Sequence, residues 1–376
     1  CWRSSFIFRL KISIDSFVSI NIFFVLMFML FGNTALASEH ADGGEKAFNP
    51  SELINHHIYD TNEWHIATFN EGEEGEFHIT IPLPIIVKDG KGWHVFMSSS
   101  VAHGEVIDGY TLEHGVLVNK EGLEKAQIPD LFKGTEKVFY DLSITKNVFA
   151  LFISVLIILG LFISMANSYK KSLVPTGVAR FFEPVVLLIR DGIAIPNIGS
   201  KHYKKFMPFL LTIFFFIWLN NLIGLVPFFP GGANLTGNIA VTLVLSLFTL
   251  FTILLNANKD YWKHIFWPPV PFLLKPIMIP LEIIGIFTKP FSLTMRLMAN
   301  ITAGHIMILS IISLIFIFKN AALGAVSVPL ALFVSILELL VAALQAYIFT
   351  ILSALYIGIA VAEHGHDDAH GHAEGH

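Results

Sequence analysis

An arginine lies inside an apolar run that is long enough to cross a lipid bilayer, and this feature constrains the chain more than any other. The run, Phe291–Phe318, has about 28 residues, whereas about 20 suffice to span the hydrocarbon. Arg296, Asn300 and His305 lie within it. A guanidinium at membrane depth costs between about 3 and about 17 kcal/mol, depending on how the cost is measured. The run therefore indicates a functional site, with a counter-charge elsewhere in this chain or in a partner.

As a helix, the run places its polar side chains on distinct faces, because successive residues are about 100° apart. One slowly drifting face carries four residues spaced four apart, namely Ser292, Arg296, Asn300 and Gly304. His305 points roughly to the opposite side from Arg296. The small residues Ala299, Ala303 and Gly304 are typical of positions where another helix comes close.

The composition favours an integral membrane protein. The 376 residues are 54% hydrophobic and only 14% charged, and the mean hydropathy is +0.66, which is the profile of a membrane chain. The single cysteine, Cys1, excludes an intrachain disulfide and a cysteine-based metal site. The nucleotide-binding pattern G-x-x-x-x-G-K-[ST] does not occur. We therefore expect no cofactor, no bound nucleotide and no nucleic-acid partner.

The first residues predict a signal peptide (1–37). Arg3, Arg9 and Lys11 precede an apolar run over residues 17–31, and the small-residue pattern A-L-A follows at 35–37. An uncleaved first membrane helix is the alternative. In either case, the residues that follow are expected outside the cytoplasm.

Residues 38–143 are predicted to form a polar, extracytoplasmic (periplasmic) extension. Apolar and polar residues alternate over Phe77–Leu83, and the turn Asp89-Gly90 precedes Trp93–Met97, which predicts a β-hairpin. Pro82 and Pro84 indicate an edge strand. The rest of this segment is expected to be weakly ordered. Its histidines have no regular ligand spacing, so solvated surface is favoured over a metal site.

Five transmembrane helices are predicted in residues 144–362, so the fold class is an all-α membrane protein with long, tilted fourth and fifth helices. The expected spans are Asn147–Ala166, Phe206–Val226, Asn238–Leu255, Phe291–Phe318 and Val328–Val361. Prolines break the apolar segment Val270–Phe287, which we interpret as an interfacial or re-entrant approach to the fourth span.

The distribution of lysine and arginine predicts the orientation of the spans. The segments 167–205 and 259–264 are rich in lysine and are expected in the cytoplasm. The uncharged segment 227–237 is expected outside. This arrangement places the C-terminus in the cytoplasm. The histidine-rich tail, 363–376, could bind transition metals, but a solvated tail is the simpler interpretation.

The fifth span carries Glu338 and Gln345 on one helical face, since they are seven residues apart. Glu338 and His305 are at similar distances from the loop between the fourth and fifth spans, so two antiparallel helices would bring them to similar depth. An acid and an imidazole together can relay protons near neutral pH. An arginine cannot release its proton and therefore cannot relay one.

The fourth span resembles subunit a of the F-type, rotary ATP synthase in its pattern S-L-x-x-R-L-x-x-N-x-x-A-G-H, residues 292–305. The segment Asn221–Pro227 is similar to the N-L-x-G-L-x-P end of that family's second helix. Leu344–Phe349 is similar to its L-Q-A-[FY]-[IV]-F signature, Lys289-Pro290 precedes the fourth helix as in the family, and Glu282 stands at a position that is often acidic. The resemblance covers about residues 175–362.

The resemblance implies a stator subunit of the cell inner membrane, multi-pass in the lipid bilayer, with two half-channels against a rotating c-ring of carboxylate-bearing helical hairpins and with the peripheral-stalk subunit b as another partner. It assigns the catalytic charge to Arg296. The implied proton pathway comprises His305, Glu338, Gln345, Asn300, Ser292 and Glu282.

This sequence departs from many bacterial members of the family in two ways. His305 and Glu338 exchange the usual acid and imidazole positions, and Gly237 stands where many members have Asp.

Two other classes of protein are alternatives. A stand-alone, proton-coupled secondary transporter would also have intramembrane charges, but no internal repeat is found. A membrane metalloprotease would need a pattern such as H-E-x-x-H, which is absent.

Overall fold

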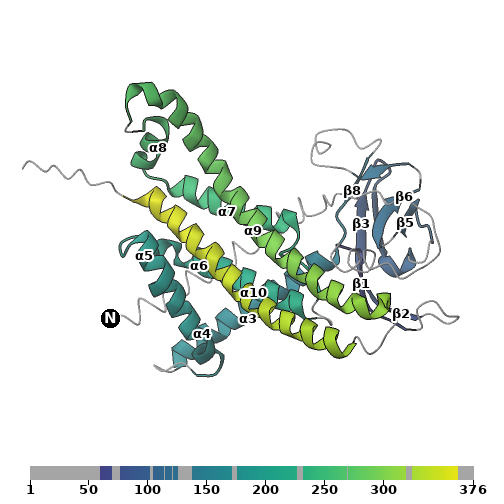
Figure 1. Cartoon of the computed structure of the whole chain (residues 1–376). Helices are drawn as coiled ribbons and strands as arrows, with labels where there is room; N and C mark the ends of the chain where they lie inside the picture. Colours follow the sequence, from purple (N-terminus) through teal and green to yellow (C-terminus); the bar gives the residue numbers. More distant parts are fainter. Residues whose placement is uncertain are drawn as a thin grey trace, which may run out of the picture.

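The computed structural model describes residues 60–69, 77–101, 105–113, 115–120, 122–125, 138–171, 176–226, 232–268, 270–318 and 324–362. The predicted signal peptide and the histidine-rich tail lie outside these residues. β-Strands lie at one end of the molecule, and long helices form the remainder (Figure 1).

Among the described residues, five helices are long and apolar enough to cross a membrane, which is the number that the sequence predicts. They are α3 (Lys146–Lys171), α6 (Tyr203–Leu225), α7 (Ile239–Asn256), α9 (Lys275–Ile317) and α10 (Gly324–Val361). Shorter segments connect them, namely α4 (Val178–Leu187), the π-helix η4 (Leu188–Ala194), α5 (Ile195–Ile198), α8 (Lys259–Phe266) and the 3-10 turn η5 (Phe272–Leu274).

The prediction that prolines break Val270–Phe287 is wrong for most of this segment, because residues 275–287 form the first part of α9. Its interfacial or re-entrant placement stays a prediction. Pro280 and Pro290 lie inside one continuous helix. Each proline removes one backbone hydrogen bond, and membrane helices tolerate this loss where local adjustments satisfy the freed group. α9 has 43 residues. At about 1.5 Å per residue it is about 65 Å long, roughly twice the thickness of the hydrocarbon, so it must be strongly tilted or extend beyond the hydrocarbon.

α6 forms the centre of the helical core. In its most apolar stretch, 67% of the residues are buried by the rest of the chain, against 17% for α9 and 28% for α10. Phe215 of α6 meets Phe162 of α3 edge to face, with 5.2 Å between ring centroids. α10 packs against α6 and α9, and the two longest helices lie together across the front of Figure 1. The helices that carry Arg296, His305 and Glu338 are thus the ones least covered by their own chain.

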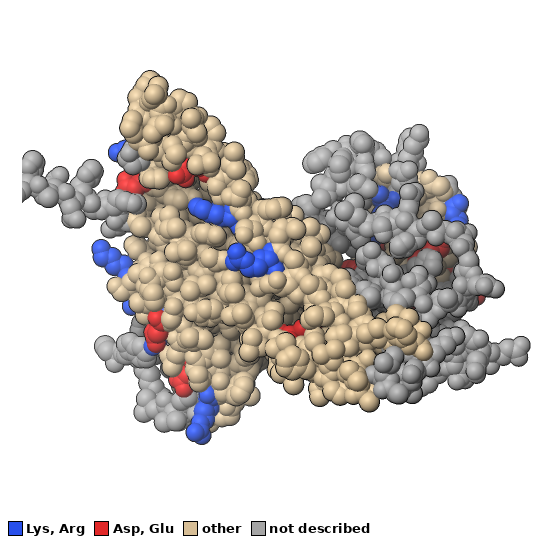
Figure 2. All heavy atoms as spheres, in the orientation of Figure 1, with Lys and Arg blue, Asp and Glu red and all other residues tan. Residues whose placement is uncertain are grey.

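The two ends of the helical part differ in charge. Most of its visible charged side chains lie toward the end away from the strands, on the left of Figure 2. At that end, Asn258 donates its backbone N–H to the carbonyl of Ala360 at 2.9 Å, so α7 and α10 end together. At the other end, Ala233 shares a hydrophobic cluster with Trp64. The strands and the segment after α6 therefore lie at the same end, as the predicted topology requires.

The strands form an N-terminal domain, by which we mean the described residues between 60 and 141. Its strands are β1 (Glu63–Phe69), β2 (Phe77–Pro82), β3 (Pro84–Lys88), β4 (Trp93–Met97), β5 (Tyr110–Glu113), β6 (Val116–Asn119), β7 (Glu124–Lys125) and β8 (Val138–Asp141). β1 pairs with β2, β5 with β6, and the remaining strands form a sheet in the order β4-β3-β8-β7.

The predicted hairpin is correct at its turn and wrong in its first strand. β3 and β4 pair around Asp89-Gly90, with Lys88 opposite Trp93, whereas β2 pairs with β1. β3 is an inner strand of its sheet, not an edge. Pro84 is tolerated there because it is the first residue of β3, and β8 pairs only with Val87 and Lys88. The expectation of weak order elsewhere is also wrong for β5, β6 and β8, which share a buried core with β3.

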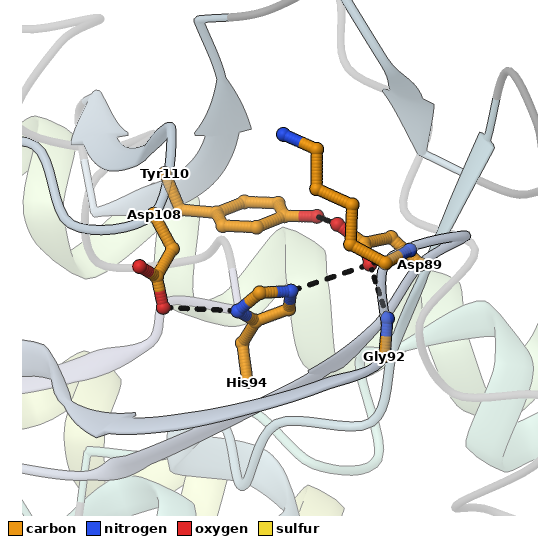
Figure 3. Close-up of polar contacts among 6 residues, drawn as sticks. Asp89, Gly92, His94, Asp108 and Tyr110 are labelled. Carbon is orange, nitrogen blue, oxygen red and sulfur yellow. Dashed lines mark hydrogen bonds and ion pairs between the residues drawn. The ribbon is translucent and has the colours of Figure 1, made fainter.

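An imidazole between two carboxylates joins the β3–β4 hairpin to the turn before β5 (Figure 3). His94 places Nδ1 2.9 Å from Asp108 Oδ2 and Nε2 3.2 Å from Asp89 Oδ1. The buried carboxylate of Asp89 also accepts a 3.0 Å hydrogen bond from the hydroxyl of Tyr110. Asp108 has φ +52° and Gly109 φ +84°, a backbone shape that an Asp-Gly turn favours.

Candidate functional site

Arg296 lies in α9, and its side chain is half-buried. Within the described part of the chain, it makes no ion pair and no hydrogen bond with another residue. Ser292, one turn earlier, is exposed, as are Ala299 and Ala303 on the same side of the helix. The expected close approach of a helix at the small residues is therefore met within this chain at Gly304 alone. The face beside Arg296 is open to lipid or to a partner.

Asn300 joins the two longest helices. Its Nδ2 donates a 2.8 Å hydrogen bond to Oε1 of Gln345 in α10. Gln345 is buried, with 2% of its surface exposed. The bridge lies one helical turn beyond Arg296, because residues four apart fall on the same side of a helix.

Glu338 lies across Gly304. A Cβ atom built at Gly304 would collide with the Glu338 carboxylate, so a residue without a side chain lets the two helices meet there. Glu338 is only 9% exposed. Its Oε2 is buried and has no hydrogen-bond partner among the residues that the structure describes. A buried polar atom in this state needs a functional or structural explanation.

A small cavity brings His305 and Glu338 together. Its wall also includes Asn300 of α9 and Asn221 of α6. Its inner space has room for about one water molecule. The sequence placed His305 and Glu338 at similar depth, and in the structure both side chains line this one space. An acid and an imidazole beside room for a water can pass a proton between them, and the two amides can hydrogen-bond to that water.

α6 supplies two cavity features that the sequence analysis did not assign to the site. Asn221 donates to the carbonyl of Ala342 at 3.4 Å and accepts a 2.6 Å hydrogen bond from Thr236. A Cβ built at Gly224 would lie 3.8 Å from His305 Nε2, so α6 ends beside the imidazole. The signal in the sequence was the pair Asn220-Asn221 in an otherwise apolar run, because buried amides in membrane helices bond across helices.

Glu282 is not part of this cavity. Its nearest ion-pair partner among the described residues is His264 of α8, with 3.9 Å between His264 Nδ1 and Glu282 Oε1. Along α9, Glu282 precedes Arg296 by 14 residues, which corresponds to about 21 Å. The order of groups along α9 is therefore Glu282, Ser292, Arg296, Asn300 and His305, with the strand-bearing end of the molecule on the His305 side.

Buried hydroxyl groups bind α7, α9 and α10 together near Arg296. Ser246 of α7 lies 2.6 Å from the hydroxyl of Thr294, and Thr249 lies 3.5 Å from the hydroxyl of Ser353. These contacts fix the helices and were not predicted. Among the described residues, no three histidine, cysteine or acidic side chains are grouped closely enough to hold a metal ion.

The helical part matches a known protein family. Residues 148–358 match the family described as ATP synthase A chain. Residues 53–142, which include the whole N-terminal domain, match a separate family described as Domain of unknown function (DUF8433).

The chain is also similar to curated proteins named ATP synthase subunit a, and the similarity extends over most of the length of each. The chain is 49% identical over 246 residues to ATP synthase subunit a of Chloroherpeton thalassium, covering 63% of this chain and 72% of the relative. It is 40% identical over 303 residues to ATP synthase subunit a of Myxococcus xanthus, covering 79% and 92%. It is 39% identical over 338 residues to ATP synthase subunit a of Chlorobium phaeobacteroides, covering 88% and 81%.

Proposed function

The chain belongs to the ATP synthase A chain family, and from that premise we propose that it is the stator proton-channel subunit of an F-type ATP synthase. In this role it faces a rotating c-ring and provides two half-channels that couple proton translocation to rotation. Each proton that moves across about 150 mV supplies about 3.5 kcal/mol, so several are needed for each ATP made elsewhere in the complex.

The observation that carries the proposal is the isolated charge of Arg296. It lies on a membrane helix of which only 17% of the most apolar stretch is covered by this chain, and no acid among the described residues pairs with it. A cation at membrane depth without a counter-charge is costly, so a carboxylate on a partner is the natural complement. A rotating ring of carboxylates fulfils this requirement. Each ring carboxylate would pair with Arg296 in turn and leave it as the ring rotates.

The outer half-channel is proposed to run through the cavity between α6, α9 and α10. Protons arrive at His305 and Glu338, pass the Asn300–Gln345 bridge, and reach a ring carboxylate. After nearly a full turn of the ring they leave past Ser292 toward the end that holds Glu282. Arg296 lies between these two groups of residues. It cannot release its proton, so it separates the half-channels while attracting the deprotonated ring carboxylate.

The orientation follows from the basic residues. Lys201, Lys204, Lys259 and Lys263 lie in the segments 199–205 and 257–268, and an excess of such residues marks the cytoplasmic side. The N-terminal domain is then periplasmic, and the C-terminus is cytoplasmic. We further propose that residues 1–37 are a cleaved signal peptide, that the membrane is the cell inner membrane, and that subunit b of the peripheral stalk is a second partner.

Copurification from solubilised membranes tests the proposal. A tagged chain should bring with it a ring of small helical-hairpin subunits and a peripheral-stalk subunit, and vesicles that contain this membrane sector should conduct protons. Purification of the chain alone, with neither ring subunits nor proton conductance, would refute the stator role.

A further inference from the structure

The N-terminal domain is attached to the first membrane helix by a buried polar contact. Asp60 accepts a 2.8 Å hydrogen bond from the hydroxyl of Thr145 and a 3.1 Å bond from the backbone N–H of Asn147. The carboxylate thereby caps the start of α3, where free N–H groups favour a negative charge. The backbone N–H of Lys146 also donates to the carbonyl of Thr61 at 3.0 Å. Residues 60 and 61 are thus fixed to the beginning of α3.

An apolar contact follows immediately. Trp64 of β1 is 4% exposed and meets Phe149 of α3 edge to face, with 5.8 Å between ring centroids. Trp64 and Ala150 belong to one buried cluster with Ala233, which lies in the segment between α6 and α7. This cluster therefore unites three parts of the chain: β1, the start of α3, and the segment 232–238, which we call the outer segment.

The outer segment in turn covers the end of α6 beside the proton-path cavity. A Cβ built at Gly224 would lie 3.3 Å from the carbonyl oxygen of Ala233 and 3.8 Å from His305 Nε2. The hydroxyl of Thr236 donates a buried 2.6 Å hydrogen bond to Asn221, which lines the cavity. The outer segment therefore contacts the wall of the cavity at two points.

We propose that the N-terminal domain is a positioning element of the outer half-channel, which holds the outer segment against α6 through Asp60 and Trp64 and so fixes Asn221 and the wall beside His305. The inference rests on the proposed function. It assigns a role to a domain that lies outside residues 148–358, the part of the chain that matches the ATP synthase A chain family. Trp64 and Asp60 are positioning residues, because they act through the outer segment and do not touch the cavity.

A purely structural role of the domain would have a different consequence. A domain that serves only to stabilise the complex would lower the amount of assembled complex when it is weakened, but it would leave the proton dependence of each assembled complex unchanged. The outer pH at which proton conductance is half-maximal distinguishes the two roles, because it reports on the surroundings of His305 and Glu338.

The test uses the assembled membrane sector in vesicles, with proton conductance under an imposed potential measured against outer pH and normalised to the copurified ring. The series Trp64→Phe, Trp64→Leu and Trp64→Ala removes the contact with Phe149 in steps. We expect conductance to fall in that order, by about tenfold for Trp64→Ala, since small misplacements near a reacting group have effects of this size or larger. The outer pH of half-maximal conductance should shift along the same series. Trp93→Ala is the matched control, because Trp93 is 61% exposed in the same domain.

A second variant keeps the test decisive if Trp64→Ala fails to assemble. Thr236→Val removes the hydrogen bond to Asn221 at nearly constant volume, and it should shift the same midpoint without disturbing the domain. Unchanged conductance and midpoint in the assembled Trp64→Leu and Thr236→Val complexes would overturn this inference while leaving the stator role intact. A wild-type complex that conducts no protons would instead refute the proposed function itself.

Discussion

Asn300 of α9 donates a 2.8 Å hydrogen bond to the side chain of Gln345 in α10, one helical turn beyond Arg296. The bridge links the two helices that are least covered by their own chain, and it lies on the route that we propose for protons between the outer cavity and the ring. Its geometry leads to the first prediction.

Asn300→Leu and Gln345→Leu should each slow proton-driven ATP synthesis, because each leaves one amide without its partner. The double variant should be little slower than the worse single variant, since both remove the same interaction. ATP synthesis in inverted vesicles, normalised to assembled complex, measures all three. Fully additive losses would show that the two amides act separately.

Gly304→Ala should reduce proton-driven ATP synthesis by roughly tenfold or more, because the new Cβ would displace the Glu338 carboxylate from its place against α9. Gly285→Ala is the matched control in the same helix, since nothing lies within 4 Å of a Cβ built there. Equal activities of the two variants would contradict the assigned position of Glu338.

Glu338→Gln should slow the uptake of protons from the outer side, because an amide cannot accept and release a proton in the range in which a carboxylate does. A double variant that exchanges the two residues, His305→Glu with Glu338→His, should regain part of the lost conductance, because the acid and the imidazole would still share one cavity. Absence of any recovery would argue that the two residues do not share a site.

The N-terminal domain should lose stability as the pH rises through the pKa of His94. The hydrogen bond to Asp108 is the largest cause that raises this pKa above the ordinary 6.5, with burial opposing it and Asp89 adding to it. A raised pKa stabilises the folded domain fully below 6.5, and that stability is lost above the folded value. Hydrogen-exchange protection of β3 to β5 in the intact complex should fall over this interval in the wild type, but not in His94→Gln.

Asp89 has the opposite dependence. Burial disfavours its charged form, but hydrogen bonds from Tyr110, from the amides of Lys91 and Gly92, and from His94 outweigh this effect, so its pKa is lowered below the ordinary 3.8. Its contribution to stability is present above 3.8 and is lost as the pH falls through the folded pKa. The domain should therefore be most stable between the two transitions. A protection that rises steadily with pH would contradict the assignment of His94, and one that falls steadily with pH would contradict that of Asp89.

The sequence was sufficient for the five spans and for naming Arg296, His305 and Glu338 as candidates, because charged or titratable side chains within an apolar run are costly. Arg296, His305 and Glu338 each interrupt an apolar run, and antiparallel helices of known rise bring the last two to similar depth. Asn221 was visible for the same reason, but its link to Thr236 depends on a loop whose path no periodicity predicts.

The strand pairing was harder to predict. Only Leu83, which continues the alternating pattern, separates β2 from β3. Tertiary contacts decide that β2 pairs with β1 while β3 pairs with β4. The continuous α9 was missed because prolines were given the weight they have in water-soluble helices, whereas Pro280 and Pro290 are accommodated here. For the strands, contacts with distant parts of the chain override a correct local preference.

Arg296→Ala gives the most direct test of the account. Vesicles that contain this variant should make no ATP from an imposed proton gradient, yet should remain passively permeable to protons, because the charge that separates the half-channels is lost while the cavity around His305 and Glu338 is intact. Copurified ring subunits confirm assembly. Normal proton-driven ATP synthesis by an assembled Arg296→Ala complex would contradict the central claim.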